Sequence, residues 1–132
     1  MNKDRKRELL ELFSTARIEK YFGTTLSFDD KGHVHVDLPY NPNFDQPYGI
    51  HGGVVATLLD TAGFFAAATV SRSVLLTTSE LSIHFLSPAL ECDLHAEGWI
   101  IKAGKRISIA EMRVSEPNGA VIAIGTGTFV VL

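Results

Sequence analysis

The sequence predicts an α+β fold in which a long central apolar helix is wrapped by a five- to six-stranded antiparallel sheet, with an extra N-terminal helix. Three observations predict it. Residues 52–70 are apolar or small apart from one charged residue, and this run is longer than a typical strand. The later runs alternate with period two between short turns. Residues 3–20 place their apolar side chains on one helical face.

The composition is that of one globular domain spanning residues 1–132. At 45% hydrophobic and 20% charged residues, a chain of this length can bury a core. The net charge of -3 argues against the basic surface that nucleic-acid binding requires. The single Cys92 cannot form an intrachain disulfide, so we expect a cytoplasmic protein. We expect neither an export signal nor a membrane span, because the N-terminal apolar residues are scattered and Asp60 interrupts the longest apolar run.

The N-terminal third predicts a helix followed by a hairpin. The amphipathic helix covers residues 3–20 and ends at Gly23. Strand-like runs at about 24–29 and 33–38 are joined by "DDKG", which is typical of a hairpin turn. Residues 39–50 are rich in Pro and Asn and predict a loop.

The remainder predicts the central helix and most of the sheet. A helix from Gly52 to about Val70 is apolar nearly all round, so it should be buried on most sides. Small side chains repeat along it at helical spacing: Gly52, Ala56, Asp60, Gly63 and Ala67. A period-two strand follows and ends before Pro88. Further strands are expected at about 91–102, 105–115 and 120–131.

Short turns between these strands imply an antiparallel meander, because parallel pairs need long crossovers. A sheet of five or six strands covers one side of the helix and leaves free edges. A second copy of the chain, pairing edge to edge, would close the sheet. We therefore expect at least a dimer.

The strongest candidate site is His51-Gly52-Gly53, where the loop meets the central helix. The first turn of a helix has free backbone N–H groups and the positive end of the helix dipole. Because glycine has no side chain, a substrate carbonyl oxygen could approach these groups, each worth roughly 3–4 kcal/mol to a developing oxyanion. The alternative is that the glycines only permit a tight turn.

Asp60 is the charged residue within the apolar helix. Its neighbours predict an interior position: Leu58, Leu59, Ala62, Phe64 and Phe65. A buried carboxylate near helix N–H donors is a candidate general base or nucleophile. The alternative is a structural carboxylate that accepts a hydrogen bond from a nearby Thr and supports the helix.

The stretches "QPYGIHGGVVATLLDTA" and "TTSELSIHFLSPA" resemble the hotdog-fold acyl-CoA thioesterases of the phenylacetate-pathway and medium-chain thioesterase-superfamily type. The resemblance covers about residues 30–131 and leaves residues 1–22 as a variable helical extension. It implies a hotdog domain that forms a homodimer with one continuous sheet, and dimers that often pair into a homotetramer. The implied substrate is an acyl-CoA.

The resemblance also implies roles at the helix. Asp60 matches the catalytic acid, which acts either as base for water or as nucleophile on the thioester. Gly52 matches the residue whose backbone N–H polarises the thioester carbonyl. His51 matches the motif histidine that holds the loop and the carbonyl in register.

Two further positions match less directly. Gln46 matches an upstream polar residue, but the loop is one residue shorter than usual, so Asp45 is the alternative. Thr78 matches the small hydroxyl residue that orients the attacking water. In such dimers Asp60 and Thr78 face Gly52 and Gln46 of the other chain.

The predicted activity is hydrolysis of an acyl-CoA thioester to free acid and CoA. The alternatives are an acyl-thioester hydratase or dehydratase, and a non-catalytic acyl-CoA-binding hotdog module. We expect no cofactor, since coenzyme A is part of the substrate, and no metal. His33, His35 and Asp37 have a spacing compatible with a metal, but such alternation is ordinary on a half-exposed strand.

Overall fold

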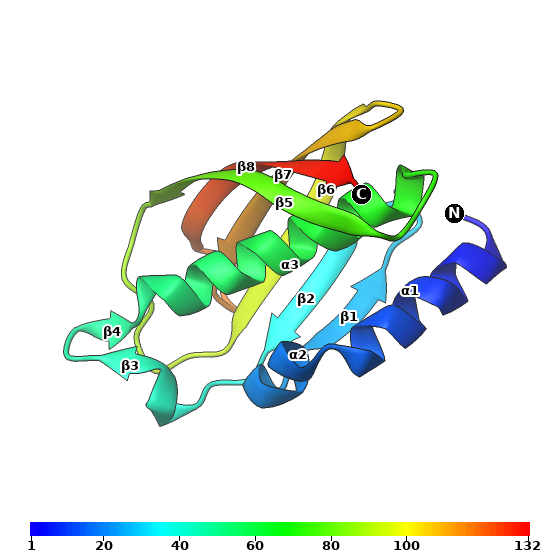
Figure 1. The fold of residues 1–132 in the computed structure, drawn as a ribbon. Coiled ribbons are helices and arrows are strands. Elements are labelled where there is room, and N and C mark those ends of the chain that lie inside the picture. Colours follow the sequence, from blue (N-terminus) through cyan, green and yellow to red (C-terminus); the bar gives the residue numbers. More distant parts are fainter.

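A computed structural model describes residues 1–132 and confirms the predicted α+β hotdog architecture: a long helix packed on a six-stranded antiparallel sheet (Figure 1). The helices are α1 (Lys3–Thr15), α2 (Arg17–Phe22), the short 3-10 helix η1 (Pro42–Phe44) and α3 (Gly52–Val70). The strands are β1 (Thr25–Phe28), β2 (Val34–Leu38), β3 (Asp45–Gln46), β4 (Gly49–Ile50), β5 (Leu76–Phe85), β6 (Leu94–Ala103), β7 (Ile107–Ser115) and β8 (Val121–Val131).

The sheet has the strand order β1-β2-β6-β7-β8-β5, and every pair is antiparallel. The predicted meander is confirmed for β6, β7 and β8, which follow one another in sequence and in space. β5, the first strand after the central helix, lies at the outer edge beside β8. Its other side has no partner strand within the chain.

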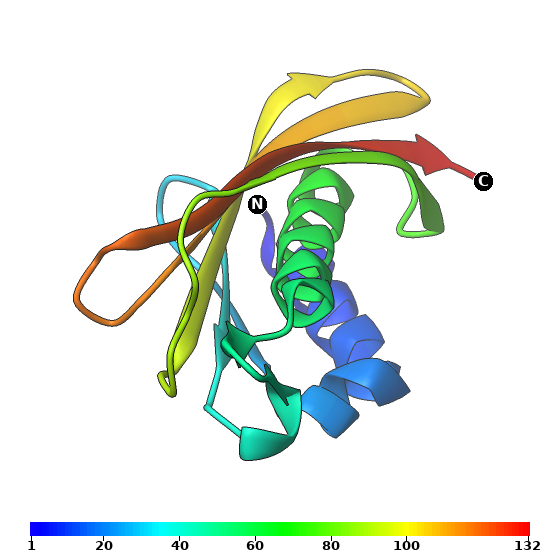
Figure 2. The same cartoon turned by 90° about the vertical axis from the view of Figure 1, so that its left-hand side faces the viewer.

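The central helix α3 begins at Gly52 and is the core of the fold. Figure 2 looks along this helix and shows the sheet curving around it, with α1 and α2 against another side. Its length and composition would suit a membrane span, but 61% of its apolar window is buried inside the fold. Such burial is typical of a core helix, because the protein itself removes the apolar side chains from water.

Helix and sheet approach closely where α3 crosses β6. A β-carbon on Gly98 would lie 2.6 Å from the carbonyl oxygen of Ala62, so only glycine fits there. Of the small-residue stripe, Gly63 and Ala67 are buried on the sheet, and Gly63 leaves room for the Phe129 ring. The N-terminal part of the stripe stays half-exposed, so that face of the helix is open in a single chain.

The predicted N-terminal helix over residues 3–20 is wrong in one respect, because it breaks at Ala16 into α1 and α2. Ala16 is extended, with φ -76° and ψ 107°. The hydroxyls of Ser14 and Thr15 donate to the carbonyls of Glu11 and Leu12, at 2.7 and 2.9 Å, and such bonds favour helix ends. The break turns α2 toward α3.

Candidate active site

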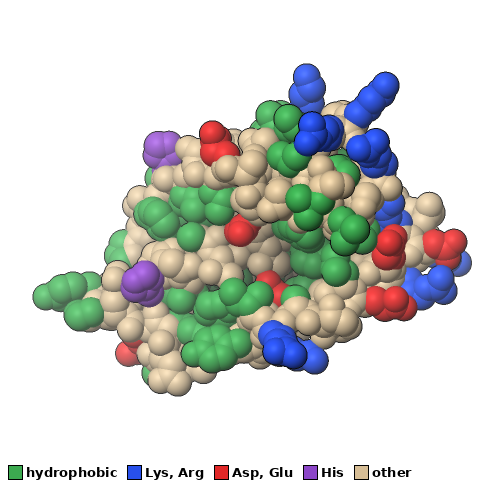
Figure 3. Space-filling view, viewed as in Figure 1, with side chains coloured by type: hydrophobic (Ala, Val, Ile, Leu, Met, Phe, Trp, Pro, Cys, Tyr) green, Lys and Arg blue, Asp and Glu red, His purple; other side chains and the backbone are tan.

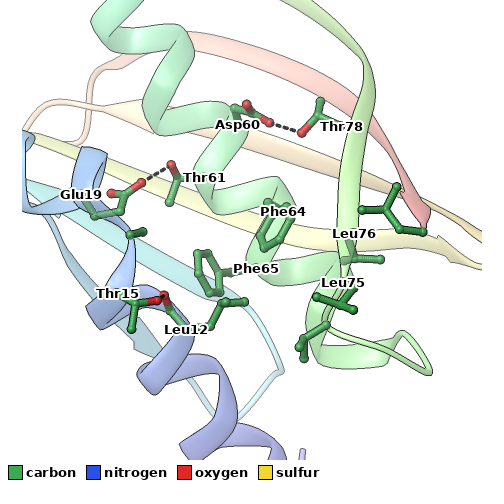
Figure 4. Close-up of a pocket in the computed structure, with 13 residues that line it drawn as sticks. Leu12, Thr15, Glu19, Asp60, Thr61, Phe64, Phe65, Leu75, Leu76 and Thr78 are labelled. Carbon is green, nitrogen blue, oxygen red and sulfur yellow. Dashed lines mark hydrogen bonds between the residues drawn. The ribbon is translucent and has the colours of Figure 1, made fainter.

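An apolar pocket of about 370 Å³ lies between α3, β5 and the two N-terminal helices. Eight of its 13 lining residues are hydrophobic. Figure 4 shows Leu12, Phe64, Phe65, Leu75 and Leu76 around this space. On the same face, Figure 3 shows isolated acidic side chains at a hollow bordered by hydrophobic ones. A pocket of this kind suits an apolar group attached to a polar reacting centre.

Asp60 and Thr78 meet at this pocket, as the dashed line in Figure 4 shows. The Thr78 hydroxyl donates to Asp60 Oδ1 at 2.8 Å. The expectation of an interior Asp60 is corrected, since its side chain is half-buried in the single chain. The reason is that, around Asp60, no other helix or strand of the single chain packs over the open face of α3. The carboxylate therefore has one fixed donor and remains accessible from the pocket.

A β-bulge turns Thr78 toward the helix. The pairing of β5 with β8 shifts register between Thr78 and Glu80, so Ser79 is the extra residue. Simple alternation would place Thr78 on the same face as Glu80, away from Leu81 and Ile83. With the extra residue, Thr78 shares the inner face with these two, both of which pack against the core. Bulges commonly re-aim a side chain beside a functional site.

A second carboxylate at the pocket was missed by the sequence reasoning. Glu19, on α2, is only 4% exposed, yet it has no Lys, Arg or His partner. Its Oε1 accepts from the Thr61 hydroxyl at 2.7 Å, and its Oε2 accepts from the Thr24 hydroxyl. In the sequence Glu19 is one of many charged residues of an amphipathic helix, and only the break at Ala16 brings it to the pocket.

The start of α3 presents one free backbone donor. His51 is the N-cap residue, and its Nδ1 accepts from the Gly53 N–H at 2.7 Å. The His51 N–H donates to the Phe44 carbonyl at 2.8 Å, so this residue ties the loop to the helix. A neutral imidazole that accepts through Nδ1 carries its proton on Nε2. The Gly52 N–H has no acceptor within the chain.

The two candidates for the upstream polar residue differ in their surroundings. Gln46 shares a second pocket, of about 310 Å³, with Gly52 and Phe85. Asp45 instead accepts a hydrogen bond from the Tyr40 hydroxyl, and this bond raises the pKa of Tyr40 to about 12. Asp45 is thus occupied, whereas Gln46 makes no side-chain hydrogen bond within the chain and is free to meet a ligand.

The two halves of the predicted site lie apart within one chain. Gly52 and Asp60 are eight residues apart on one helix, a separation of about 12 Å along its axis. A reacting carbonyl group must lie about 3 Å from both its oxyanion donor and the attacking group. One chain therefore brings Asp60 together with Thr78, and Gly52 together with Gln46, but does not join the two pairs.

The Thr78 hydrogen bond leads to a prediction of its own. Thr78→Val removes the donor and keeps the shape, and a hydrogen bond to a charged group is worth about 1.5–3 kcal/mol. We expect kcat for the predicted thioester hydrolysis to fall about 10-fold or more. The matched control is Thr77→Val, on the exposed neighbour. Equal losses in both variants, measured by release of free thiol, would show that Thr78 does not orient the reacting groups.

Comparison with known proteins identifies the family. Residues 49–123, from just before the helix N-cap to β8, match the model of the family described as "Thioesterase superfamily". The chain belongs to the thioesterase superfamily. A relative from Saccharolobus solfataricus, named "Putative esterase SSO1253", is 31% identical over 94% of this chain and 83% of its own length.

Two solved structures have the same fold as this chain. The BH2602 protein of Bacillus halodurans, crystallised with CoA, is 30% identical, with a TM-score of 0.81 over 100% of this chain and 95% of its own. The E. coli PaaI protein of the phenylacetic acid degradation operon has a TM-score of 0.86 over 97% and 93% of the two chains at 21% identity, which shows the shared fold. The resemblance found in the sequence is confirmed, and thioester hydrolysis is the general activity that this superfamily supports.

Proposed function

We propose that this thioesterase-superfamily protein hydrolyses acyl-CoA thioesters to free acid and CoA. The observation that carries the proposal is the half-buried Asp60 carboxylate, held by Thr78 at 2.8 Å beside an apolar pocket. The similar BH2602 protein, crystallised with CoA, supports CoA as the carrier. The apolar lining of the pocket supports an acyl group on the other side of the reacting carbonyl.

In this mechanism the thioester carbonyl lies over the start of an α3 helix. The Gly52 N–H donates to its oxygen as negative charge develops, and the positive end of the helix dipole adds to the stabilisation. Asp60 either removes a proton from the attacking water or attacks the carbonyl carbon itself. In both routes the C–S bond breaks and CoA leaves as its thiolate; in the second route water then hydrolyses the mixed anhydride formed on Asp60. Gln46 lies beside Gly52 and would hold the thioester in register. His51 fixes the helix start through its bond to Gly53.

The site requires a second copy of the chain, because Gly52 and Asp60 are too far apart on one helix. β5 offers a ten-residue edge without a partner strand. A two-fold axis that pairs two β5 edges antiparallel also sets the two α3 helices in opposite directions. Each Asp60 then comes toward the other chain's helix start. Exposed apolar side chains near the ends of β5 would be covered in such a dimer: Leu75, Phe85 and Leu86.

A panel of acyl-CoA esters tests the proposal. Aryl, short and long acyl-CoA esters would be incubated with the protein, and free CoA would be followed with a thiol-detecting reagent. We expect release of CoA with at least one acyl class. Binding without CoA release would indicate a non-catalytic acyl-CoA-binding module. A change in enoyl absorbance without CoA release would indicate a hydratase or dehydratase, and either result would overturn the proposal.

A further inference from the structure

A cluster of histidines and carboxylates lies on the outer face of the sheet, away from α3. In β2 the core-facing residues are Val34, Val36 and Leu38, all buried, so the residues between them face outward. β6 follows the same rule next to β2. The outward residues of this cluster are His33, His35, Asp37, His95 and Glu97, with Asp29 at the start of the β1–β2 turn. None of them lines the pocket of Asp60.

Within this cluster two imidazoles face each other. His35 Nδ1 and His95 Nε2 lie 3.0 Å apart, with the ring centroids 5.1 Å apart and the ring planes inclined by 28°. The opposite nitrogen of each ring contacts a carboxylate. His35 Nε2 lies 2.7 Å from Asp29 Oδ2, and His95 Nδ1 lies 2.7 Å from Asp37 Oδ1.

These contacts require one positive charge between His35 Nδ1 and His95 Nε2. An ionised carboxylate only accepts hydrogen bonds, so Asp29 and Asp37 each take the N–H of the imidazole that they contact. A neutral imidazole carries a single N–H. His35 Nδ1 and His95 Nε2 then present two lone pairs to each other at 3.0 Å, which is repulsive unless a cation lies between them.

A third ligand lies beside the two nitrogens. Glu97 is the partner of His35 in the β2–β6 register, and ligand atoms of His35, His95 and Glu97 all lie within 4.8 Å of one another. Its Oε2 lies 2.5 Å from His33 Nδ1 and its Oε1 lies 3.6 Å from Arg113, so a metal ion would share this carboxylate with them. All three side chains are partly exposed, at 22, 35 and 21%, so a metal ion and water can reach them. Imidazole nitrogens with a carboxylate form a donor set suited to zinc and neighbouring metals.

We propose that His35 Nδ1, His95 Nε2 and the Glu97 carboxylate bind one divalent transition metal ion, with Zn²⁺ as its probe and water completing the coordination. Tetrahedral zinc at 2.0–2.1 Å from each nitrogen places the two nitrogens about 3.4 Å apart, so the rings need to separate by about 0.4 Å. Asp29 and Asp37 are then positioning residues, because a carboxylate on the far nitrogen orients a metal-bound imidazole.

This proposal differs from the expectation of no metal, which was based on His33, His35 and Asp37 alone. Pairing with β6 adds His95 and Glu97, and the turn adds Asp29. Because the metal would join β2 to β6 on the far side of the sheet from Asp60, its role is to stabilise the fold. Metal that binds only the folded chain raises the melting temperature as its concentration rises.

The test is zinc binding by the full chain, without an affinity tag, after dialysis against a chelator. Isothermal titration with Zn²⁺ is expected to give one ion per chain, and Tm is expected to rise with Zn²⁺. His35→Gln and His95→Gln should each bind Zn²⁺ at least about 100-fold more weakly, and Asp37→Asn about 10- to 100-fold more weakly. Circular dichroism checks that each variant is folded.

The matched control is His84→Gln, which removes an exposed histidine on β5 outside the cluster and should keep the wild-type affinity. Co²⁺ offers a second readout, because its visible absorption reports coordination by nitrogen and oxygen ligands. Equal zinc affinity in wild type and His95→Gln would overturn the proposal. So would a histidine pair that takes up a shared proton in an NMR titration but no Zn²⁺. Hydrolysis of acyl-CoA should not change with the chelator, so this test is independent of the proposed function.

Discussion

Replacing Asp60 by Asn is expected to lower kcat for acyl-CoA hydrolysis by roughly 10²–10⁴, the range for loss of a general base. The substitution keeps the size of the side chain, and its amide oxygen can still accept the hydrogen bond from Thr78. The fold should therefore persist, because Asp60 is only half-buried and makes no ion pair. The measurement is single-substrate kinetics by thiol release, together with Tm.

The control for this prediction is Glu19→Gln, at the other carboxylate of the same pocket. Both Glu19 oxygens already accept hydroxyl protons from Thr61 and Thr24, so this group is held as part of the pocket wall. We expect a smaller loss of kcat than in Asp60→Asn. If Glu19→Gln proves the more damaging change while Asp60→Asn keeps near-wild-type turnover, the reacting carboxylate is Glu19 and the proposed mechanism is wrong.

The central helix could be predicted from the sequence because its signals are local. An apolar run without Pro, preceded by His-Gly-Gly, places a helix start at Gly52, and the structure begins α3 there. The strands of the meander could be predicted equally well, since period-two alternation and short turns depend on neighbouring residues. The break at Ala16 could not be predicted in this way, because it depends on hydrogen bonds from side-chain hydroxyls within the last turn of α1.

The site itself was only partly predictable. Asp60 and Gly52 stand out in the sequence as a charge and a glycine in special positions. The orientation of Thr78 depends on a bulge at Ser79, which follows from the pairing of β5 with β8 and not from β5 alone. The position of Glu19 depends on how α2 packs against α3. Such features depend on the packing of elements that are distant in sequence, so they cannot be predicted from either element alone.

Gly52→Pro is expected to lower kcat by roughly 10²–10³, the cost of removing one oxyanion donor. Proline deletes the backbone N–H, and Gly52 is the first residue of α3, where proline is well tolerated. The preceding His51 already has φ -58° and ψ 134°, which a following proline requires. A β-carbon at this position would lie 3.4 Å from the Phe85 ring, an ordinary contact. Tm should therefore change little.

Two further comparisons isolate the N–H and locate it in the dimer. Gly52→Ala adds the same β-carbon and keeps the N–H, so it should lose far less turnover than Gly52→Pro, and equal losses would remove Gly52 as a donor.

Mixing Gly52→Pro chains with Asp60→Asn chains then tests the shared site. If each site joins Gly52 of one chain to Asp60 of the other, half of the randomly mixed dimers hold one intact site, which restores about a quarter of wild-type activity. A site contained within one chain predicts no recovery, since every chain in the mixture carries a defect.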